Sequence, residues 1–422
     1  GSLFIGFLLL TGCSSNESLN GNTASAPIDA TPSGTAEPSA PAMDREVVRS
    51  SVRRAGPADR AADFVTVSSH SLVYTGLVLP IDAEGKLVGE GSDQQQIRQV
   101  LANLNTLLAA TGSGLERLAK VNIYADSADT IDKFQQQLWS RLDAAVRPAV
   151  CAVVSPLSTA GALVAVDVVA IADDHGEKVD LQQYEGVASE HNYADAAVMP
   201  RGGVAYLSGH ADKSPLPQAT ANSMTALLDV VRQLRLHPSQ IVQLKVFIDS
   251  AAECHTVRSE LKKLFPDQMV PPVIFVEWIA SAPVEIEMIV HLPRENWRDG
   301  EPLRFFTPAD VKPSPVFSKA ALVQTDRQTF ISGLTSREPG PGEVQVRDVF
   351  TQLQEILSAS GSDMNHLAKA TYYVSSQDAS DMLNELRPEY YHPKRPPAAS
   401  KAMVHGVGRA DRTLCMDMIC LL

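Results

Sequence analysis

The apolar residues of the chain repeat one pattern three times. Residues 97–108 place an apolar side chain at every third or fourth position, which predicts a helix with one buried face. The same spacing returns at 224–234 and at 346–357. After each helix comes a short apolar run with one lysine inside it. These runs are LAKVNIY, QLKVFID and LAKATYY, and their lysines are Lys120, Lys245 and Lys369.

The flanking segments complete a repeat of seven elements. A predicted strand precedes each helix, at 72–79, 204–211 and 329–336. A second helix is expected to open near a serine, at Ser127, Ser250 and Ser376. Two apolar strands then close each repeat. The order β-β-α-β-α-β-β, with both helices on one face of the sheet, predicts an α+β sandwich. Three such units can pack their bare sheet faces together around a pseudo-threefold axis.

The N-terminal region differs from these repeats. Residues 3–10 are apolar but too few to span a bilayer. The following Leu-Thr-Gly-Cys, ending at Cys13, resembles a bacterial lipobox, which implies cleavage before Cys13 and a lipid on its thiol. Residues 14–45 are rich in Ser, Thr, Ala and Pro, a composition typical of a disordered tether. We therefore expect a lipid-anchored protein of the bacterial cell envelope, on its periplasmic or surface side.

This interpretation divides the chain into five parts. They are a signal peptide with its lipobox at 1–13, a tether at 14–45, and three units at 46–178, 179–297 and 298–422, numbered one to three in chain order. The cysteines beyond Cys13 form no CxxC pair and are interpreted as small buried apolar residues: Cys151, Cys254, Cys415 and Cys420.

Composition narrows the range of partners. The chain has 422 residues and a formal net charge of -13, and its pI is near 5.2. A nucleic-acid partner is disfavoured because such binding needs a basic surface that displaces counterions. The sequence also lacks an HExxH motif, a paired-cysteine metal spacing and a glycine-rich phosphate loop. We expect no metal site and no cofactor.

The first repeat carries a specific resemblance. LVYTGLVLPIDAEGKLVGEG, followed by QIRQVLANLNTLLAATGSGLERLAKVNIYADSAD, resembles the RidA/YjgF family of enamine/imine deaminases, long labelled endoribonuclease L-PSP. The resemblance extends over all three units and is weakest in unit two. It implies the chorismate-mutase-like fold, and it implies ligand clefts between neighbouring subunits of a homotrimer. The three units of the chain are thus expected to take the places of the three subunits of such a homotrimer, so that one chain forms a pseudo-trimer and the protein is a monomer.

The chemistry of that family needs an acid and a cation. Hydrolysis of a 2-imino acid uses a carboxyl group to position water or pass a proton, and an arginine to bind the substrate carboxylate. The resemblance places the acids in the final strand of each unit, at Asp167, Glu285 and Asp417. The alternative is that these three are solvated strand carboxylates.

The arginine that binds the substrate carboxylate in the family has no counterpart at the matching positions of this chain. The matching positions hold Val150 in unit one, Val273 or Ile274 in unit two, and Ala399 in unit three. Family activity is therefore not assumed. We expect a protein that binds a small molecule such as an imino or keto acid, or a partner, in clefts between units. The alternative is an active deaminase with a substitute cation such as Lys401.

Other candidate ligand contacts come from shorter matches to the family. A hydroxyl residue followed by glycine recurs in each first strand, where glycine allows close approach of the backbone. These pairs are Thr75-Gly76, Ser208-Gly209 and Ser332-Gly333. The remaining candidates are Tyr193 and His210 in unit two, and Phe317, Asn384 and Lys401 in unit three.

Overall fold

A computed structural model of the protein describes residues 45–51, 61–184 and 191–422. The predicted lipobox at Cys13 lies outside the described residues, as does the tether apart from Arg45. Within the described part of the chain there are six α-helices. They are α1 (Asp93–Ala110), α2 (Ala128–Trp139), α3 (Leu216–Gln233), α4 (Cys254–Leu264), α5 (Gly342–Ser360) and α6 (Gln377–Tyr390). None of these described helices is long and apolar enough to cross a membrane.

The described strands form three six-stranded sheets. In spatial order, the first sheet is β5 (Ala149–Val154), β4 (Leu118–Ala125), β6 (Val164–Ala172), β3 (Ser71–Thr75), β8 (Ala196–Met199) and β7 (Asp180–Gln182). The second is β11 (Val273–Glu277), β10 (Ile241–Ile248), β12 (Val284–Leu292), β9 (Gly203–Asp212), β14 (Ala320–Val323) and β13 (Leu303–Phe306). The third is β1 (Glu46–Ser50), β2 (Phe64–Ser68), β15 (Arg327–Ile331), β18 (Leu414–Cys420), β16 (Leu367–Val374) and β17 (Ala398–Met403).

The second helix of each unit begins near its predicted serine, and in two units that serine also caps the helix. Ser127 and Ser376 are N-caps whose side chains accept a hydrogen bond from the backbone three residues later. Ser250 instead precedes a short 3₁₀ turn and makes no side-chain cap, so α4 begins only at Cys254. Gly361 ends α5 at a φ of 83°, a left-handed conformation that glycine adopts without a Cβ penalty.

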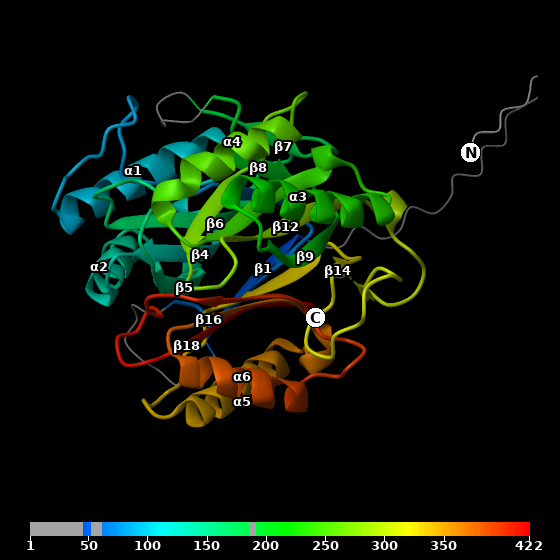
Figure 1. Ribbon diagram of the computed structural model, residues 1–422. Helices are drawn as coiled ribbons and strands as arrows, with labels where there is room; N and C mark the ends of the chain where they lie inside the picture. The colour runs from blue at the N-terminus through cyan, green and yellow to red at the C-terminus, as the bar shows by residue number, and fades with distance from the viewer. Residues whose placement is uncertain (1–44, 52–60, 185–190) are drawn as a thin grey trace, which may run out of the picture. The chain divides into compact units, whose positions relative to one another are not determined.

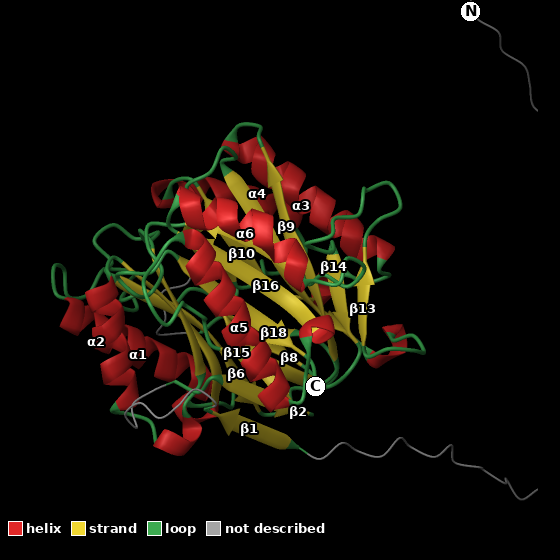
Figure 2. Cartoon of the chain, turned by 90° about the horizontal axis from the view of Figure 1, so that it is seen from below, coloured by secondary structure: helices red, strands yellow, loops and turns green. Residues whose placement is uncertain are grey.

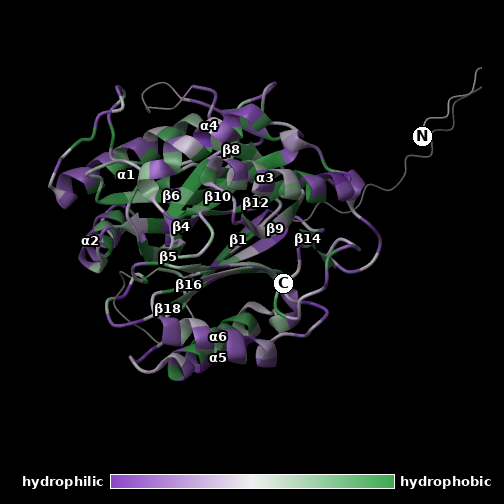
Figure 3. Ribbon diagram, viewed as in Figure 1, coloured by the Kyte–Doolittle hydropathy of each residue, from purple (hydrophilic) through white to green (hydrophobic). Residues whose placement is uncertain are grey.

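The helices cover one face of each sheet. Figure 1 shows α1 with α2, α3 with α4, and α5 with α6 as three pairs on the outside of the strands. The inward side chains of each pair are buried with one sheet face in a core of their own, as Phe134 is in unit one and Phe350 is in unit three. Figure 3 shows hydrophilic and hydrophobic residues side by side on α5 and α6, as expected for one-sided helices.

The other faces of the sheets share a central core. Tyr74 of β3, Tyr206 of β9 and Phe330 of β15 are all 1 % exposed or less and belong to one apolar cluster. This cluster joins residues from all three sheets. The predicted packing of bare faces is therefore confirmed, and the chain is an α+β intramolecular pseudo-trimer.

The sheets exchange strands around the ring. β7 and β8 follow unit one in sequence and complete its sheet, while β13 and β14 complete the sheet of unit two. The N-terminal strands β1 and β2 close the cycle, because β2 pairs antiparallel with β15 of unit three. In Figure 2, β1, β2 and β15 can be followed in one region although they lie at opposite ends of the chain. The unit boundaries proposed from sequence stay predictions, since each sheet draws on two of those units.

Candidate functional site

The three repeated lysines lie in the centre of the molecule, close to carboxylates of a neighbouring unit, and two of them form ion pairs there. Lys120 Nζ is 2.5 Å from Asp417 Oδ1 and donates a second hydrogen bond to the Ile331 carbonyl at 2.6 Å. Lys369 Nζ is 2.8 Å from Glu287 Oε2. Each of these contacts crosses a unit boundary. Both lysines are buried, so the pairs are ionic contacts shielded from solvent.

The third lysine closes the cycle with unit one. Asp167 accepts hydrogen bonds from Asn122 and from the Tyr124 hydroxyl, both at 2.8 Å. Burial raises the pKa of Asp167, and the positive charge of Lys245 opposes that rise. Burial lowers the pKa of Lys245, but Tyr373 and the surrounding carboxylates outweigh burial and raise it overall. The three lysines and three acids line one small central cavity of about 40 Å³, and we call them the axial cluster.

The axial cluster changes the interpretation of the predicted acids. Asp167 and Asp417 lie in it, bonded to their neighbours, and are not solvated strand carboxylates. Glu287 was missed by the sequence analysis. Glu287 pairs with Lys245 across two antiparallel strands. The residues paired with the repeated lysine in the other two units are apolar, Val169 in unit one and Ile419 in unit three. The signal in the sequence is that the final strand of unit two, VEIEMIV, contains two acids, Glu285 and Glu287.

The hydroxyl-glycine pairs lie where one unit meets the next. Ser332 Oγ accepts a hydrogen bond from the Val150 N–H at 2.8 Å, and Ser208 Oγ accepts one from the Ala399 N–H at 2.7 Å. Val150 and Ala399, which stand where the family has its arginine, therefore each lie beside a serine hydroxyl of a different unit: Val150 of unit one beside Ser332 of unit three, and Ala399 of unit three beside Ser208 of unit two. The unit-three candidates are consequently divided between two junctions, because Ser332 faces unit one whereas Ala399 faces unit two.

At the first junction, the backbones of units one and two are in contact. Leu77 of unit one donates to the Val273 carbonyl of unit two at 3.3 Å, while Thr75 Oγ1 accepts from the Val168 N–H of its own unit at 3.0 Å. A Cβ on Gly76 would lie 3.6 Å from that same carbonyl oxygen. Tyr193 is 3 % exposed, packs in the helix-covered core of unit two and lies beneath the Arg258 guanidinium at 4.9 Å.

The second junction, between units two and three, holds the third predicted acid. Glu285 lies against Gly209, where an added Cβ would come within 2.0 Å of its Oε1. Burial raises the pKa of Glu285 to about 7, against the opposing effects of the Ser400 hydroxyl and of Lys369 and Lys319. A carboxyl group that titrates near neutral pH can both accept and donate a proton under physiological conditions.

A cation that the sequence analysis overlooked lies at this junction. Lys319 is half-buried, and its Nζ lies 5.4 Å from the centre of the Phe317 ring. Burial lowers the pKa of Lys319, and the charge of Glu285 opposes that shift. Burial and the positive charge of Lys319 also lower the pKa of His210. Lys319 stands in the segment VFSKA that resembles the family, one residue beyond the buried Ser318.

Lys401 is placed differently from Lys319. Its Nζ donates to Ser380 Oγ at 2.9 Å and to Asn384 Oδ1 at 3.0 Å, both on α6. Both candidate residues, Lys401 and Asn384, are thus bonded to each other on the helix-covered side of the sheet. Burial and the guanidinium of Arg387 lower the pKa of Lys401, with burial the larger effect.

The third junction, between units three and one, contains a large cleft of about 1280 Å³. It is lined by Ser332, Gly333, Val150 and four arginines, Arg49, Arg147, Arg337 and Arg409. Arg49 donates to the Leu118 carbonyl at 2.7 Å, and Arg147 stacks over the Trp139 ring at 4.7 Å.

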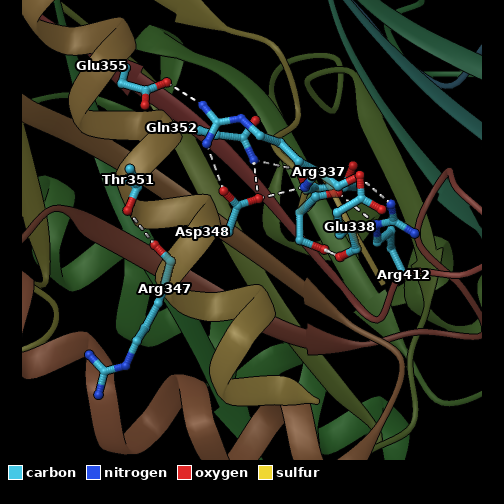
Figure 4. A network of polar contacts seen from close by, with 10 residues as sticks. Arg337, Glu338, Arg347, Asp348, Thr351, Gln352, Glu355 and Arg412 are labelled. Atoms are coloured by element: carbon cyan, nitrogen blue, oxygen red, sulfur yellow. Dashed lines mark hydrogen bonds and ion pairs between the residues drawn. The ribbon is translucent and has the colours of Figure 1, made fainter. Parts of the chain in front are cut away.

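Arg337 is held by two carboxylates of α5. Its Nη1 lies 2.8 Å from Asp348 Oδ1, and its Nη2 pairs with Glu355, as Figure 4 shows. Arg412 donates to the Arg337 carbonyl at 2.6 Å and so fixes the backbone of this segment. Three of the four cleft arginines therefore already have protein partners, while Arg409 is exposed.

Comparison with known proteins agrees with this architecture. The profile of the family described as endoribonuclease L-PSP matches residues 58–172 and 309–416, together more than half of the chain. A mouse 2-iminobutanoate/2-iminopropanoate deaminase is 26 % identical over 95 residues, covering 21 % of this chain and 70 % of that protein. The mitochondrial protein mmf1 of Schizosaccharomyces pombe is 32 % identical over 120 residues, covering 28 % and 69 %.

Solved structures of proteins described as Rid or YjgF family members are similar to part of this chain. A Rid-family protein of unknown function from Yersinia pestis is 21 % identical with a TM-score of 0.27, covering 31 % of this chain and 99 % of its own. A YjgF-family protein from Neisseria meningitidis is 20 % identical with a TM-score of 0.22, covering 28 % and 93 %. From the profile match and the identity to mmf1, the chain belongs to the endoribonuclease L-PSP family, which is the RidA/YjgF family.

Proposed function

We propose that the protein hydrolyses the imines of small 2-keto acids at the second junction, with Glu285 as the acid/base group and Lys319 as the cation that binds the substrate carboxylate. The observation that carries this proposal is the position of Glu285 beside Lys319 and Ser208-Gly209. Of the three acids predicted from sequence, Asp167 and Asp417 are engaged in the axial cluster. Glu285 lies at a junction because Glu287 takes the axial place in unit two.

The chemistry follows from those two groups. Water adds through its oxygen to the imine carbon while the Glu285 carboxylate takes a proton from that water. The proton is passed to the nitrogen, which gives a carbinolamine. Glu285 then moves the hydroxyl proton of the carbinolamine to its amino group, the C–N bond breaks as the C=O bond forms, and one imine and one water yield one keto acid and one ammonia. Lys319 pairs with the substrate carboxylate as a point charge, without the bidentate geometry of an arginine. Turnover slower than that of an arginine-containing site is therefore expected.

The test is an assay with 2-iminopropanoate generated in place by an amino-acid oxidase from alanine. Wild-type protein should speed the release of pyruvate and ammonia above the buffer rate. Glu285→Gln should lower kcat/KM by about a hundredfold, the usual contribution of a positioned acid/base group. Lys319→Met should lower it by about tenfold or more, mainly through KM.

Two lysine controls make the assay specific. Lys312→Met removes an exposed cation from the same segment and should leave the rate unchanged. Lys401→Met should also have little effect, because that side chain is bonded to α6. A wild-type rate equal to buffer would refute the proposal. If Lys401→Met lowers kcat/KM strongly and Lys319→Met does not, the cation that binds the substrate carboxylate is Lys401, the substitute suggested by the sequence.

A second candidate function rests on the cleft of the third junction. Its size and the exposed Arg409 favour binding of a small carboxylate without turnover, since in the described residues Asp417 of unit three is paired with Lys120. Calorimetric titration with 2-oxobutanoate should then show binding that Arg409→Met weakens and Lys319→Met does not. Binding that is lost in Lys319→Met instead would assign the ligand to the second junction.

A further inference from the structure

The third junction contains two cysteines that are far apart in the sequence. Cys151 of β5 and Cys415 of β18 are separated by 264 residues, yet their Sγ atoms lie 3.8 Å apart. Both thiols are buried, at 3 % and 2 % exposure. The expectation that the cysteines are buried and unpaired is confirmed for all four in the described chain. Their close approach across a unit boundary was not foreseen.

Gly333 makes room for the two sulfur atoms. A Cβ at Gly333 would lie 2.8 Å from Cys415 Sγ and 3.0 Å from Cys151 Sγ, both tighter than ordinary contacts of a Cβ atom. The amide of Gly333 also donates to the Val150 carbonyl at 2.8 Å, which brings the two backbones together beside the thiols. Cys254 and Cys420, by comparison, lie in the separate helix-covered cores of units two and three.

The pair lies at a special place in the topology. Units one and two are joined by the chain, and so are units two and three, but no peptide link joins unit three to unit one. That junction is held by the β2 and β15 ladder, by Lys120 with Asp417, and by side-chain packing. A covalent bond between these two sulfur atoms would close the ring at the one junction that the chain leaves open.

We infer that Cys151 and Cys415 are a modification site, a dithiol that a small disulfide oxidant converts into a disulfide bond across the third junction. Cys415 lines the 1280 Å³ cleft and reacts first. Its thiolate attacks one sulfur of the oxidant, forms a mixed disulfide and releases one thiol. The Cys151 sulfur, having lost its proton, then attacks Cys415 Sγ and releases the second thiol. Two electrons and two protons pass to the oxidant, and the shift needed is from 3.8 Å to about 2.05 Å between sulfurs.

The test oxidises the full-length protein with glutathione disulfide, alkylates free thiols in denaturant and maps peptides by mass spectrometry. We expect two fewer free thiols than in the reduced protein and one cross-linked peptide joining Cys151 to Cys415. Because the bond closes a loop of 264 residues, the unfolding midpoint should rise by about 5 °C or more on oxidation.

The controls distinguish this pair from general thiol oxidation. Cys415→Ala should abolish the cross-link and the rise in midpoint, whereas Cys254→Ala should retain both. Should Cys415→Ala fail to fold, the peptide map of wild-type protein still decides the question. An unchanged thiol count after oxidation, cross-links to other cysteines, or a midpoint that does not depend on redox state would overturn the inference.

Discussion

Substitution of Lys120 by methionine is expected to destabilise the protein strongly, because the Lys120 ammonium group is one half of an ion pair shielded from solvent. The Lys120 side chain is 4 % exposed and that of Asp417 is 13 % exposed, and their charged atoms are 2.5 Å apart. Methionine has a similar length and an unbranched, adaptable side chain, so lost packing contributes little. What remains is a largely buried carboxylate that has lost its ion-pair partner.

The magnitude follows from that uncompensated charge. Breaking a buried ion pair by removing one partner typically costs 3–5 kcal/mol, so we expect a loss of about 4 kcal/mol in the free energy of unfolding. The Ile331 carbonyl loses its hydrogen bond as well. Since whole domains are stable by only about 5–15 kcal/mol, a loss of this size is a large part of the total.

The assay is chemical unfolding in urea, with Lys133→Met as the matched control. Lys133 makes two ion pairs at 2.6 Å, with Asp93 and Asp129, but it is 46 % exposed and should contribute little. Adding Asp417→Asn to Lys120→Met removes the orphaned charge and should restore at least half of the lost stability. The reasoning is refuted if Lys120→Met costs no more than Lys133→Met, or if the double variant is no more stable than the single one.

Four further outcomes are expected. Because the folded-state pKa of Glu285 is raised to about 7 from an ordinary 4.5, its stabilising proton is lost as the pH rises through 7. Glu285→Gln should therefore be more stable than wild type at pH 8, by at most about 3 kcal/mol, and equal to it below pH 4.5 in urea titrations. Gly209→Ala places a Cβ 2.0 Å from Glu285 Oε1 and should reduce imine hydrolysis by about a hundredfold; an unchanged rate would contradict the proposed role of Glu285. Light scattering of residues 46–422 should give the mass of one chain, since the ring closes within it, and a trimer of whole chains would contradict this. Cys13→Ser should release the protein from bacterial membranes, and retention there would count against the lipobox.

The sequence predicted the fold well because its signals are local and occur three times. Helical spacing and N-cap serines mark the helices, and the two-residue period of strands such as β18 marks their faces. The exchange of β1 and β2 into the sheet of unit three could not be predicted, because strand pairing between distant segments leaves no local pattern. The missing side-chain cap at Ser250 could not be predicted either, since the serine is present but the turn that follows it is 3₁₀.

The candidate site was predicted in part. Ser208, Gly209 and Glu285 do lie together, and the arginine-equivalent Ala399 does lie beside them. Sequence could not show that the acid of unit three is bound by a lysine of unit one, because that contact joins Lys120 and Asp417, which are 297 positions apart. Nor could it rank Lys319 above Lys401, since both flank family-like segments and their different orientation is a property of the tertiary structure.

The exchanged strands have a consequence for the order in which the protein is made. β2 leaves the ribosome early, but its pairing partner β15 and the adjacent β18 are among the last segments to emerge. At translation rates of about 5–20 residues per second, β2 waits roughly 20–70 s for the sheet that it completes. During that time it is an unpaired strand edge, the kind of surface that pairs with other chains. Slowing translation within units two and three should therefore increase aggregation more than slowing it within unit one.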